Sequence, residues 1–212
     1  LPITDHFYVY EENIGITWSD AKNLVQASTY YGLQGYLATI LIEEESVISA
    51  EQITGTGWIG ASDEDNEGEW KWVTGPEAGT TFWYGGSSGS PALDPNGLPY
   101  YSNWNNSEPN NFGNEDYAHI TDNSTGISGS WNDLSNTGAP NGPYQPKGYI
   151  VEYGGTPGDP VLNISTSTSI YIPEITGVDL ELRNCTGGTM TFTATVSEGE
   201  IYWYDAPIGG NL

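Results

Sequence analysis

The stretch 103–133 constrains the fold most, because it concentrates carboxylate and carboxamide side chains without a single Lys or Arg. Its two polar halves, 108–116 and 131–133, are separated by a loop rich in Ser, Thr and Gly. Ca²⁺ takes six to eight oxygen ligands in proteins, and carboxylates and carboxamides supply them. Five side chains of the two halves predict a calcium site: Glu108, Asn110, Glu115, Asn132 and Asp133.

A turn-forming loop is the simpler alternative for this stretch, since Asn and Asp side chains often satisfy their own backbone. That alternative does not explain three carboxylates in close register, which would repel one another and raise a pKa without a cation. It also leaves Trp131, directly before the Asn-Asp pair, unexplained. Pro109 is a further indication, because an X-Pro bond can be cis and fix the candidate ligands on either side.

The motifs Glu-Pro-Asn (108–110), Glu-Asp (115–116) and Trp-Asn-Asp (131–133) resemble the sugar-binding calcium site of C-type lectin domains. The resemblance extends over about the first 154 residues. The other matching segments follow the family's order: Tyr8, Trp18 to Ala21, Gly35 to Ile40, Trp58 to Gly60, Trp70 to Trp72, and Gly148 to Tyr153. This resemblance implies an α+β fold with two helices, short antiparallel sheets and a long calcium-binding loop.

The resemblance also implies how sugar is bound. Two adjacent ring hydroxyls would each give a lone pair to calcium, donate to Glu108 or Glu115, and accept from Asn110 or Asn132. Asp133 would hold the ion without contacting sugar. In the family, the Glu-Pro-Asn order goes with mannose-type sugars that carry equatorial 3- and 4-hydroxyls.

An auxiliary calcium site is a second implication of the resemblance, at Asp63, Glu67, Asn111 and Asp116. Asn111 stands where the family often has a carboxylate, which removes one charge and weakens the expected site. A solvated acidic turn is the alternative reading of the segment 63–68.

The formal net charge of −24, with only four Lys and Arg residues, excludes two partner classes. Nucleic acid and anionic membranes would both be repelled by such a field. No apolar run approaches the length of a membrane span, so membrane insertion is not expected. The sequence also lacks a basic segment followed by an apolar one, so we expect that any signal peptide has been removed. A secreted or cell-surface protein is the expected setting.

Cys185 is the only cysteine, so the chain has no internal disulfide. The resembled family usually carries two bridges. Val25 and Val151 stand where one pair would be expected, and Tyr117 stands at one end of the other. A domain of about 150 residues buries enough apolar surface to fold without disulfide bridges. This pattern is more common in bacterial members of the family.

The periodicity of the first 154 residues predicts strands at 6–13, 58–61, 69–73, 117–120 and 149–153, and a short extended run at 36–40. It predicts helices at 17–28, with Thr17 as N-cap, and at 43–53. Residues 85–99 read as a long surface loop. His119 is expected to be structural, and the tryptophans to form the core: residues 18, 58, 70, 72, 83, 104 and 131.

The domain prediction is a C-type lectin-like domain at 1–154, a linker at 155–160 and a partial Ig-like β-sandwich module at 161–212. Beyond the linker, strands are predicted at 161–172, 179–183, 189–196 and 200–204. They resemble the all-β Ig-like modules of large bacterial surface proteins. The segment 161–212 is shorter than a whole Ig-type sandwich, which has about 100 residues. We therefore expect further modules in a longer chain.

The leading functional hypothesis is a calcium-dependent carbohydrate-binding module of a secreted or cell-surface adhesin. The alternative is a calcium-stabilised module of the same fold that binds protein or ice, or acts as a spacer, without binding sugar. Tyr100, Tyr101 and Phe112 fit either stacking on a sugar or anchoring of long loops. No enzyme is expected, because the chain shows no nucleophile with a paired base. Acids committed to one calcium ion also cannot serve as a glycosidase pair.

Overall fold

The computed structural model describes residues 4–162, 175–179, 193–197, 200 and 202. The chain forms two compact units, Leu1–Val161 and Leu162–Leu212. In the second unit, the described residues include the antiparallel pair β11 (Ile175–Asp179) and β12 (Thr193–Val196). Strand β12 lies within the predicted strand 189–196, whereas β11 occupies 175–179, where only its last residue was predicted as strand. Most residues of the other predicted strands, and Cys185, lie outside the described residues. The Ig-like sandwich therefore stays a prediction.

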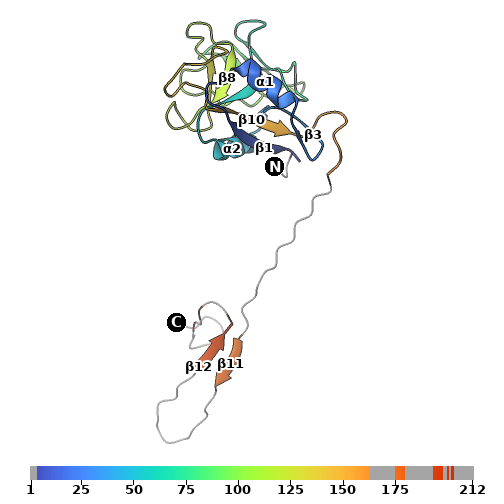
Figure 1. The fold of residues 1–212 in the computed structure, drawn as a ribbon, viewed down its shortest axis with the longest axis vertical. Coiled ribbons are helices and arrows are strands. Elements are labelled where there is room, and N and C mark those ends of the chain that lie inside the picture. The colour runs from blue at the N-terminus through green and yellow to red at the C-terminus, as the bar shows by residue number, and fades with distance from the viewer. Residues whose placement is uncertain (1–3, 163–174, 180–192, 198–199, 201, 203–212) are drawn as a thin grey trace, which may run out of the picture. The chain divides into compact units, whose positions relative to one another are not determined.

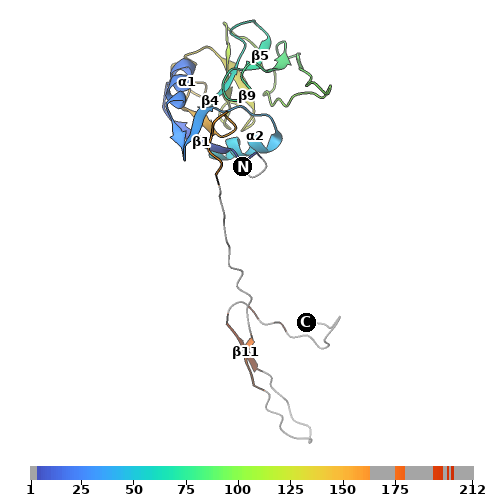
Figure 2. The same cartoon turned by 90° about the vertical axis from the view of Figure 1, so that its right-hand side faces the viewer.

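The first unit has two helices and a connected sheet of ten strands among its described residues (Figures 1 and 2). The helices are α1 (Trp18–Gln26) and α2 (Glu43–Gln52). The strands are β1 (Phe7–Glu12), β2 (Thr29–Tyr30), β3 (Leu33–Leu37), β4 (Gly57–Ser62), β5 (Glu69–Trp72), β6 (Thr81–Tyr84), β7 (Ser90–Pro91), β8 (Tyr117–Ile120), β9 (Trp131–Leu134) and β10 (Gly148–Tyr153). This mixture of helices and mainly antiparallel strands agrees with the predicted α+β class.

Strand β10 organises the sheet, because it pairs with three other strands and is buried along its whole length. It lies antiparallel to β1 and β3, and parallel to β4. The main path then continues from β4 through β5 and β6 to β7, while β8 connects β4 to β9. The pairing of Phe7 with Tyr153 joins the first and last strands of the unit.

The two predicted helices are confirmed, and each begins as the sequence indicates. The Thr17 hydroxyl accepts a 3.0 Å hydrogen bond from the Asp20 N–H, which caps α1. Three glutamates occupy the first turn of α2, where the helix dipole favours negative charge. Helix α1 buries Val25 and β10 buries Val151, the two apolar residues at the expected disulfide positions.

Several strands differ from the prediction. The extended run expected at 36–40 begins three residues earlier as β3, and β2, β6 and β9 were not expected as strands. Residues 85–99 were expected as loop, but they contain β7 and an isolated bridge between Leu93 and Pro99. Strand β9 escapes a periodicity argument because its polar Asn132 and Asp133 are as buried as the apolar residues beside them.

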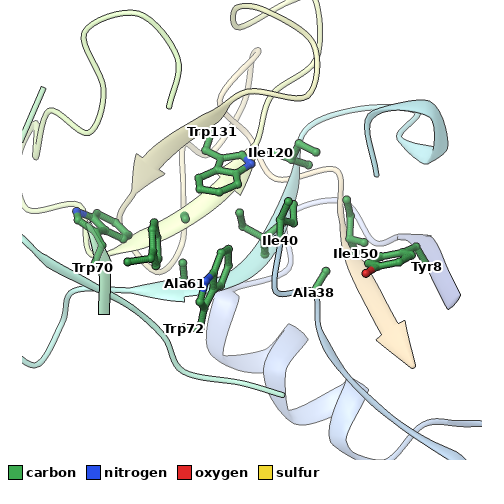
Figure 3. Close-up of a cluster of buried hydrophobic side chains, with 12 residues drawn as sticks. Tyr8, Ala38, Ile40, Ala61, Trp70, Trp72, Ile120, Trp131 and Ile150 are labelled. Carbon is green, nitrogen blue, oxygen red and sulfur yellow. The ribbon is translucent and has the colours of Figure 1, made fainter. Parts of the chain in front are cut away.

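Tryptophans dominate the core (Figure 3). The Trp72 ring stacks on Phe82 at 4.6 Å between centroids and meets the edge of Trp131 at 5.6 Å. Trp18, Trp58 and Trp70 are also buried, whereas two predicted core residues, at positions 83 and 104, are only partly buried against the cluster. No helix of the described residues is long and apolar enough to cross a membrane.

Candidate functional site

Asp133 brings the two halves of the polar stretch together. Its side chain on β9 is fully buried, and its carboxylate accepts hydrogen bonds from the backbone N–H groups of Asn110 (3.0 Å) and Asn111 (2.7 Å). The Glu108–Pro109 bond in the same loop is cis, the form that the sequence allowed. The Trp131 ring, packed in the core two residues earlier, fixes the position from which Asp133 reaches the loop.

The other four predicted ligands lie around this contact. The Asn110 side-chain amide donates to Glu108 Oε2, and Glu115 Oε2 accepts a 3.1 Å bond from the Phe112 N–H. Asn132 is buried next to Asp133, and its amide donates to the Asp133 backbone carbonyl. The structure thus gathers carboxylates and carboxamides from two distant segments at one place.

The electrostatics of this group favour a bound cation. Burial, and then the adjacent Asp133 carboxyl, raise the pKa of Glu108 to about 8. Burial and the Asp133 charge also raise the pKa of Glu115 to about 7. The charged neighbours responsible are themselves carboxylates, so a divalent cation would relieve the repulsion that the folded chain imposes. The donor set of hard oxygens fits Ca²⁺.

Three of the four predicted auxiliary residues form a second acidic group. Asp63 is buried, its Oδ2 accepts a 2.8 Å bond from the Gly68 N–H, and its backbone N–H donates to the Asp116 carbonyl (3.2 Å). Burial, helped by the charges of Glu67 and Asp116, raises the pKa of Asp63 to about 7, although the hydrogen bond from Gly68 opposes the shift.

One buried oxygen in this group lacks a donor. Asp63 Oδ1 has no hydrogen-bond partner among the described residues, which is the environment that a cation would satisfy. The fourth residue, Asn111, uses its side-chain oxygen to accept a 2.7 Å bond from the Glu115 N–H. The auxiliary group therefore offers three carboxylates, one of them with a buried oxygen left free by the described residues, and one carboxamide oxygen that is already hydrogen-bonded.

Sequence reasoning missed a third cluster, in which His6 has a partner that the sequence did not reveal. His6 Nδ1 lies 2.6 Å from Glu152 Oε1, and the Tyr8 hydroxyl donates to the same oxygen at 3.0 Å. Thr39 donates to the other Glu152 oxygen through its N–H (2.9 Å), and Glu45 lies close by. Glu152 was the available signal, because a charged residue inside an apolar strand is seldom buried without partners.

His119 lies on β8, opposite Asn132 of the neighbouring strand β9. It is fully buried, and burial lowers its pKa to about 4, so the ring is neutral at physiological pH. Its Nδ1–H donates to the backbone carbonyl of Asn132 at 3.2 Å, across the β8–β9 pair. This contact supports the strand that carries two candidate ligands, in line with the structural role expected for His119.

Comparison with known proteins identifies the family. The family described as the Lectin C-type domain matches residues 15–138. Halomucin of Haloquadratum walsbyi is 37% identical over 199 residues, which cover 93% of this chain and 2% of halomucin. The perlucin-like protein of Mytilus galloprovincialis is 29% identical over 126 residues, which cover 57% of this chain and 63% of that protein. The chain thus spans less than two thirds of these relatives.

A solved structure shows the same fold. The structure of the EPNH mutant of CEL-I superposes with a TM-score of 0.50 at 22% identity, covering 71% of this chain and 90% of that one. The family match covers more than half of the chain and includes both polar halves around Asp133. The chain therefore belongs to the C-type lectin family.

Proposed function

We propose that the first unit is a calcium-dependent carbohydrate-binding module that recognises vicinal hydroxyls of mannose-type sugars. The observation that carries this proposal is the hold of the Asp133 carboxylate on the 108–116 loop, through the N–H groups of Asn110 and Asn111. Burial, and then the Asp133 carboxyl, raise the pKa of Glu108 and Glu115 in the same loop. The residues that would hold the ion are Glu108, Asn110, Glu115, Asn132 and Asp133. A bound Ca²⁺ would supply positive charge to the oxygens of two adjacent hydroxyls.

The side chains of this chain would supply the remaining partners of each hydroxyl. Glu108 and Glu115 accept the hydroxyl protons, while the amides of Asn110 and Asn132 donate to the hydroxyl oxygens. In the structure the Asn110 amide already donates to Glu108, so a donor and an acceptor suited to one hydroxyl stand side by side. Pairing every polar group matters, because a buried unpaired group costs about 1–3 kcal/mol.

The order Glu-Pro-Asn supports the choice of mannose-type over galactose-type sugars, as the resemblance implies. Two adjacent hydroxyls offer few contacts, so a single site would bind weakly and adhesion would need several copies. The chain matches only 2% of halomucin, which supports its place as one module of a longer secreted or cell-surface adhesin. Asp63, Glu67, Asn111 and Asp116 would hold a second, weaker ion.

Phe112 is the exposed aromatic nearest to these ligands in the chain, with 84% of its surface accessible. Its N–H donates to both Asn110 Oδ1 (2.8 Å) and Glu115, so the backbone fixes the residue between two proposed sugar-binding side chains. We assign it the stacking role, in contrast to Tyr100 and Tyr101, which pack against the core.

A glycan array, read with calcium and again with a chelator, tests this function. The proposal expects retention of mannose-type glycans only with calcium, and loss of retention in Glu108→Gln. If calcium raises the melting temperature but no sugar is retained, the module is calcium-stabilised and binds protein or ice, or acts as a spacer. If calcium changes neither stability nor retention, the calcium site itself is wrong.

A further inference from the structure

One exposed segment differs in charge from the rest of this acidic chain. Between Glu77 and Asp94 the sequence has no Asp, Glu, Lys or Arg, although the chain carries 28 acidic residues. The segment forms β6, the tip 85–89 and β7, the last strand on the main path of the sheet. Between Thr81 and Pro91, the exposed residues are aromatic, hydroxylated or glycine: Tyr84, Gly86, Ser87, Ser88 and Ser90.

This tip contacts the backbone beside both acidic groups of the candidate site. A Cβ atom added to Gly86 would lie 3.3 Å from the carbonyl oxygen of Pro109, between the ligands at 108 and 110. The Gly85 N–H donates to the Gly68 carbonyl at 2.7 Å, and the Gly68 N–H in turn binds Asp63. The uncharged tip therefore borders the proposed sugar-binding loop directly.

The conformation of the tip is fixed before any ligand arrives. The Trp83 indole N–H donates to the Gly85 carbonyl at 3.0 Å, and the Gly89 N–H donates to the Gly86 carbonyl at 2.7 Å. A Cβ on Gly89 would lie 2.2 Å from the Tyr84 carbonyl, so this position requires glycine. A prearranged surface loses little conformational freedom when a ligand binds.

We propose that the β6–β7 tip is a second subsite, continuous with the 108–116 loop, for the next residue of a neutral oligosaccharide. This inference rests on the proposed function, since the first sugar residue sits at the loop. Ser87 and Ser88 offer hydroxyls, and Tyr84, half exposed, offers an aromatic face of the kind that packs on sugar rings. The ligand is uncharged, because the acidic field of the chain repels anionic glycans and the tip carries no cation to attract them.

Calorimetric titration of the calcium-loaded chain with linear mannose-type ligands of one to four residues tests this subsite. We expect the dissociation constant to fall about five- to tenfold from one residue to two, the gain from about one added contact. Ser87→Glu and Ser88→Glu place charge on the tip. Each variant is expected to lose most of this gain and to keep the affinity for the single sugar.

Ser128→Glu is the matched control, because Ser128 is exposed in the loop between β8 and β9. This variant should bind both ligands as the wild type does. The subsite is wrong if the wild type binds one and two residues equally, or if the tip variants keep the full gain. If the wild type binds no sugar of any length, the proposed function fails, and the subsite with it.

Discussion

The buried carboxylate of Asp133 accepts a 3.0 Å hydrogen bond from the backbone N–H of Asn110, 23 positions earlier in the chain. Its second carboxylate oxygen accepts a 2.7 Å hydrogen bond from the backbone N–H of Asn111. A strand residue thus holds the loop that carries the other candidate ligands, and in the proposed site the same carboxylate would also bind the cation.

Asp133→Asn is expected to weaken calcium binding by at least about 100-fold, because loss of a proposed ligand should cost no less than loss of a residue that only orients a ligand. The asparagine side chain keeps one oxygen to accept a hydrogen bond, but its NH₂ group faces the N–H of either Asn110 or Asn111. One of the two hydrogen bonds to the loop is therefore also lost. Calorimetric titration with calcium measures the change. Asp94→Asn is the control, since Asp94 also accepts from two backbone N–H groups, in an exposed turn. Equal calcium affinity in both variants would remove Asp133 from the site.

Asp63→Asn tests the auxiliary group. The isosteric amide removes a buried charge and directs an NH₂ group to the place of Oδ1, which has no donor among the described residues. In chelator at neutral pH, we expect the variant to gain about 1 kcal/mol in free energy of unfolding. In saturating calcium, it should bind one ion fewer than the wild type.

Chemical denaturation and calcium stoichiometry give the two readouts for Asp63. A matched control is Asp65→Asn in the same acidic turn, because Asp65 is exposed and the amide leaves no buried group changed. A variant that loses stability in chelator and keeps the wild-type stoichiometry would show that Asp63 is structural alone.

The His6–Glu152 contact predicts a pH dependence of stability. The hydrogen-bonded Glu152 carboxylate raises the pKa of His6 above its ordinary value of 6.5, although burial opposes this, and the charges of Glu45 and Glu77 add to it. A raised pKa in the folded state means that the stabilisation is complete below pH 6.5. It is lost as the pH rises through the higher folded pKa.

His6→Gln should therefore lose about 1–2 kcal/mol of unfolding free energy at pH 5.5 and less at pH 9. Tyr8→Phe is the control, because it removes another hydrogen bond to the same Glu152 oxygen, and burial keeps the tyrosine neutral by raising its pKa. Its loss should be equal at both pH values. A His6→Gln penalty independent of pH would show that the contact is not an ion pair.

Local signals in the sequence located the helices and the polar loop, since caps and motifs act over a few residues. The capping of α1 by Thr17 is one example, because donor and acceptor lie three positions apart. The motif around Pro109 is another, because its residues are neighbours in the chain. Such features need no knowledge of tertiary contacts.

Features that depend on distant contacts were missed. His6 and Glu152 are separated by 146 positions, so no local pattern reveals the pair. Strand β9 was not predicted because Asn132 and Asp133 are polar but buried, and they break the apolar alternation that marks a strand. Asp133 is buried where it accepts hydrogen bonds from the 108–116 loop. The contact of Gly86 with Pro109 depends on how the β6–β7 tip folds against the 108–116 loop, and the glycine content of the tip alone does not predict that arrangement.

The segment after β10 carries the last prediction. Residues 155–160 were expected to be a linker, and in the structure Asp159 accepts hydrogen bonds from the N–H groups of Gln34 (3.0 Å) and Thr156 (2.9 Å). A Cβ on Gly32 would lie 3.3 Å from Pro160, so the segment also packs closely against the β2–β3 turn. Asp159→Ala removes both acceptors and should release this segment from the first unit.

Amide hydrogen exchange measures that release. The Gln34 and Thr156 amides should exchange about fivefold faster in Asp159→Ala, since each loses a hydrogen bond worth about 1 kcal/mol. Asp94→Ala removes a similar double acceptor elsewhere and should leave both amides unchanged. Unchanged exchange in Asp159→Ala would mean that the Tyr36 hydroxyl, which donates to the Gly154 carbonyl at 2.8 Å, is sufficient to hold the segment. In that case Tyr36→Phe would produce the faster exchange instead.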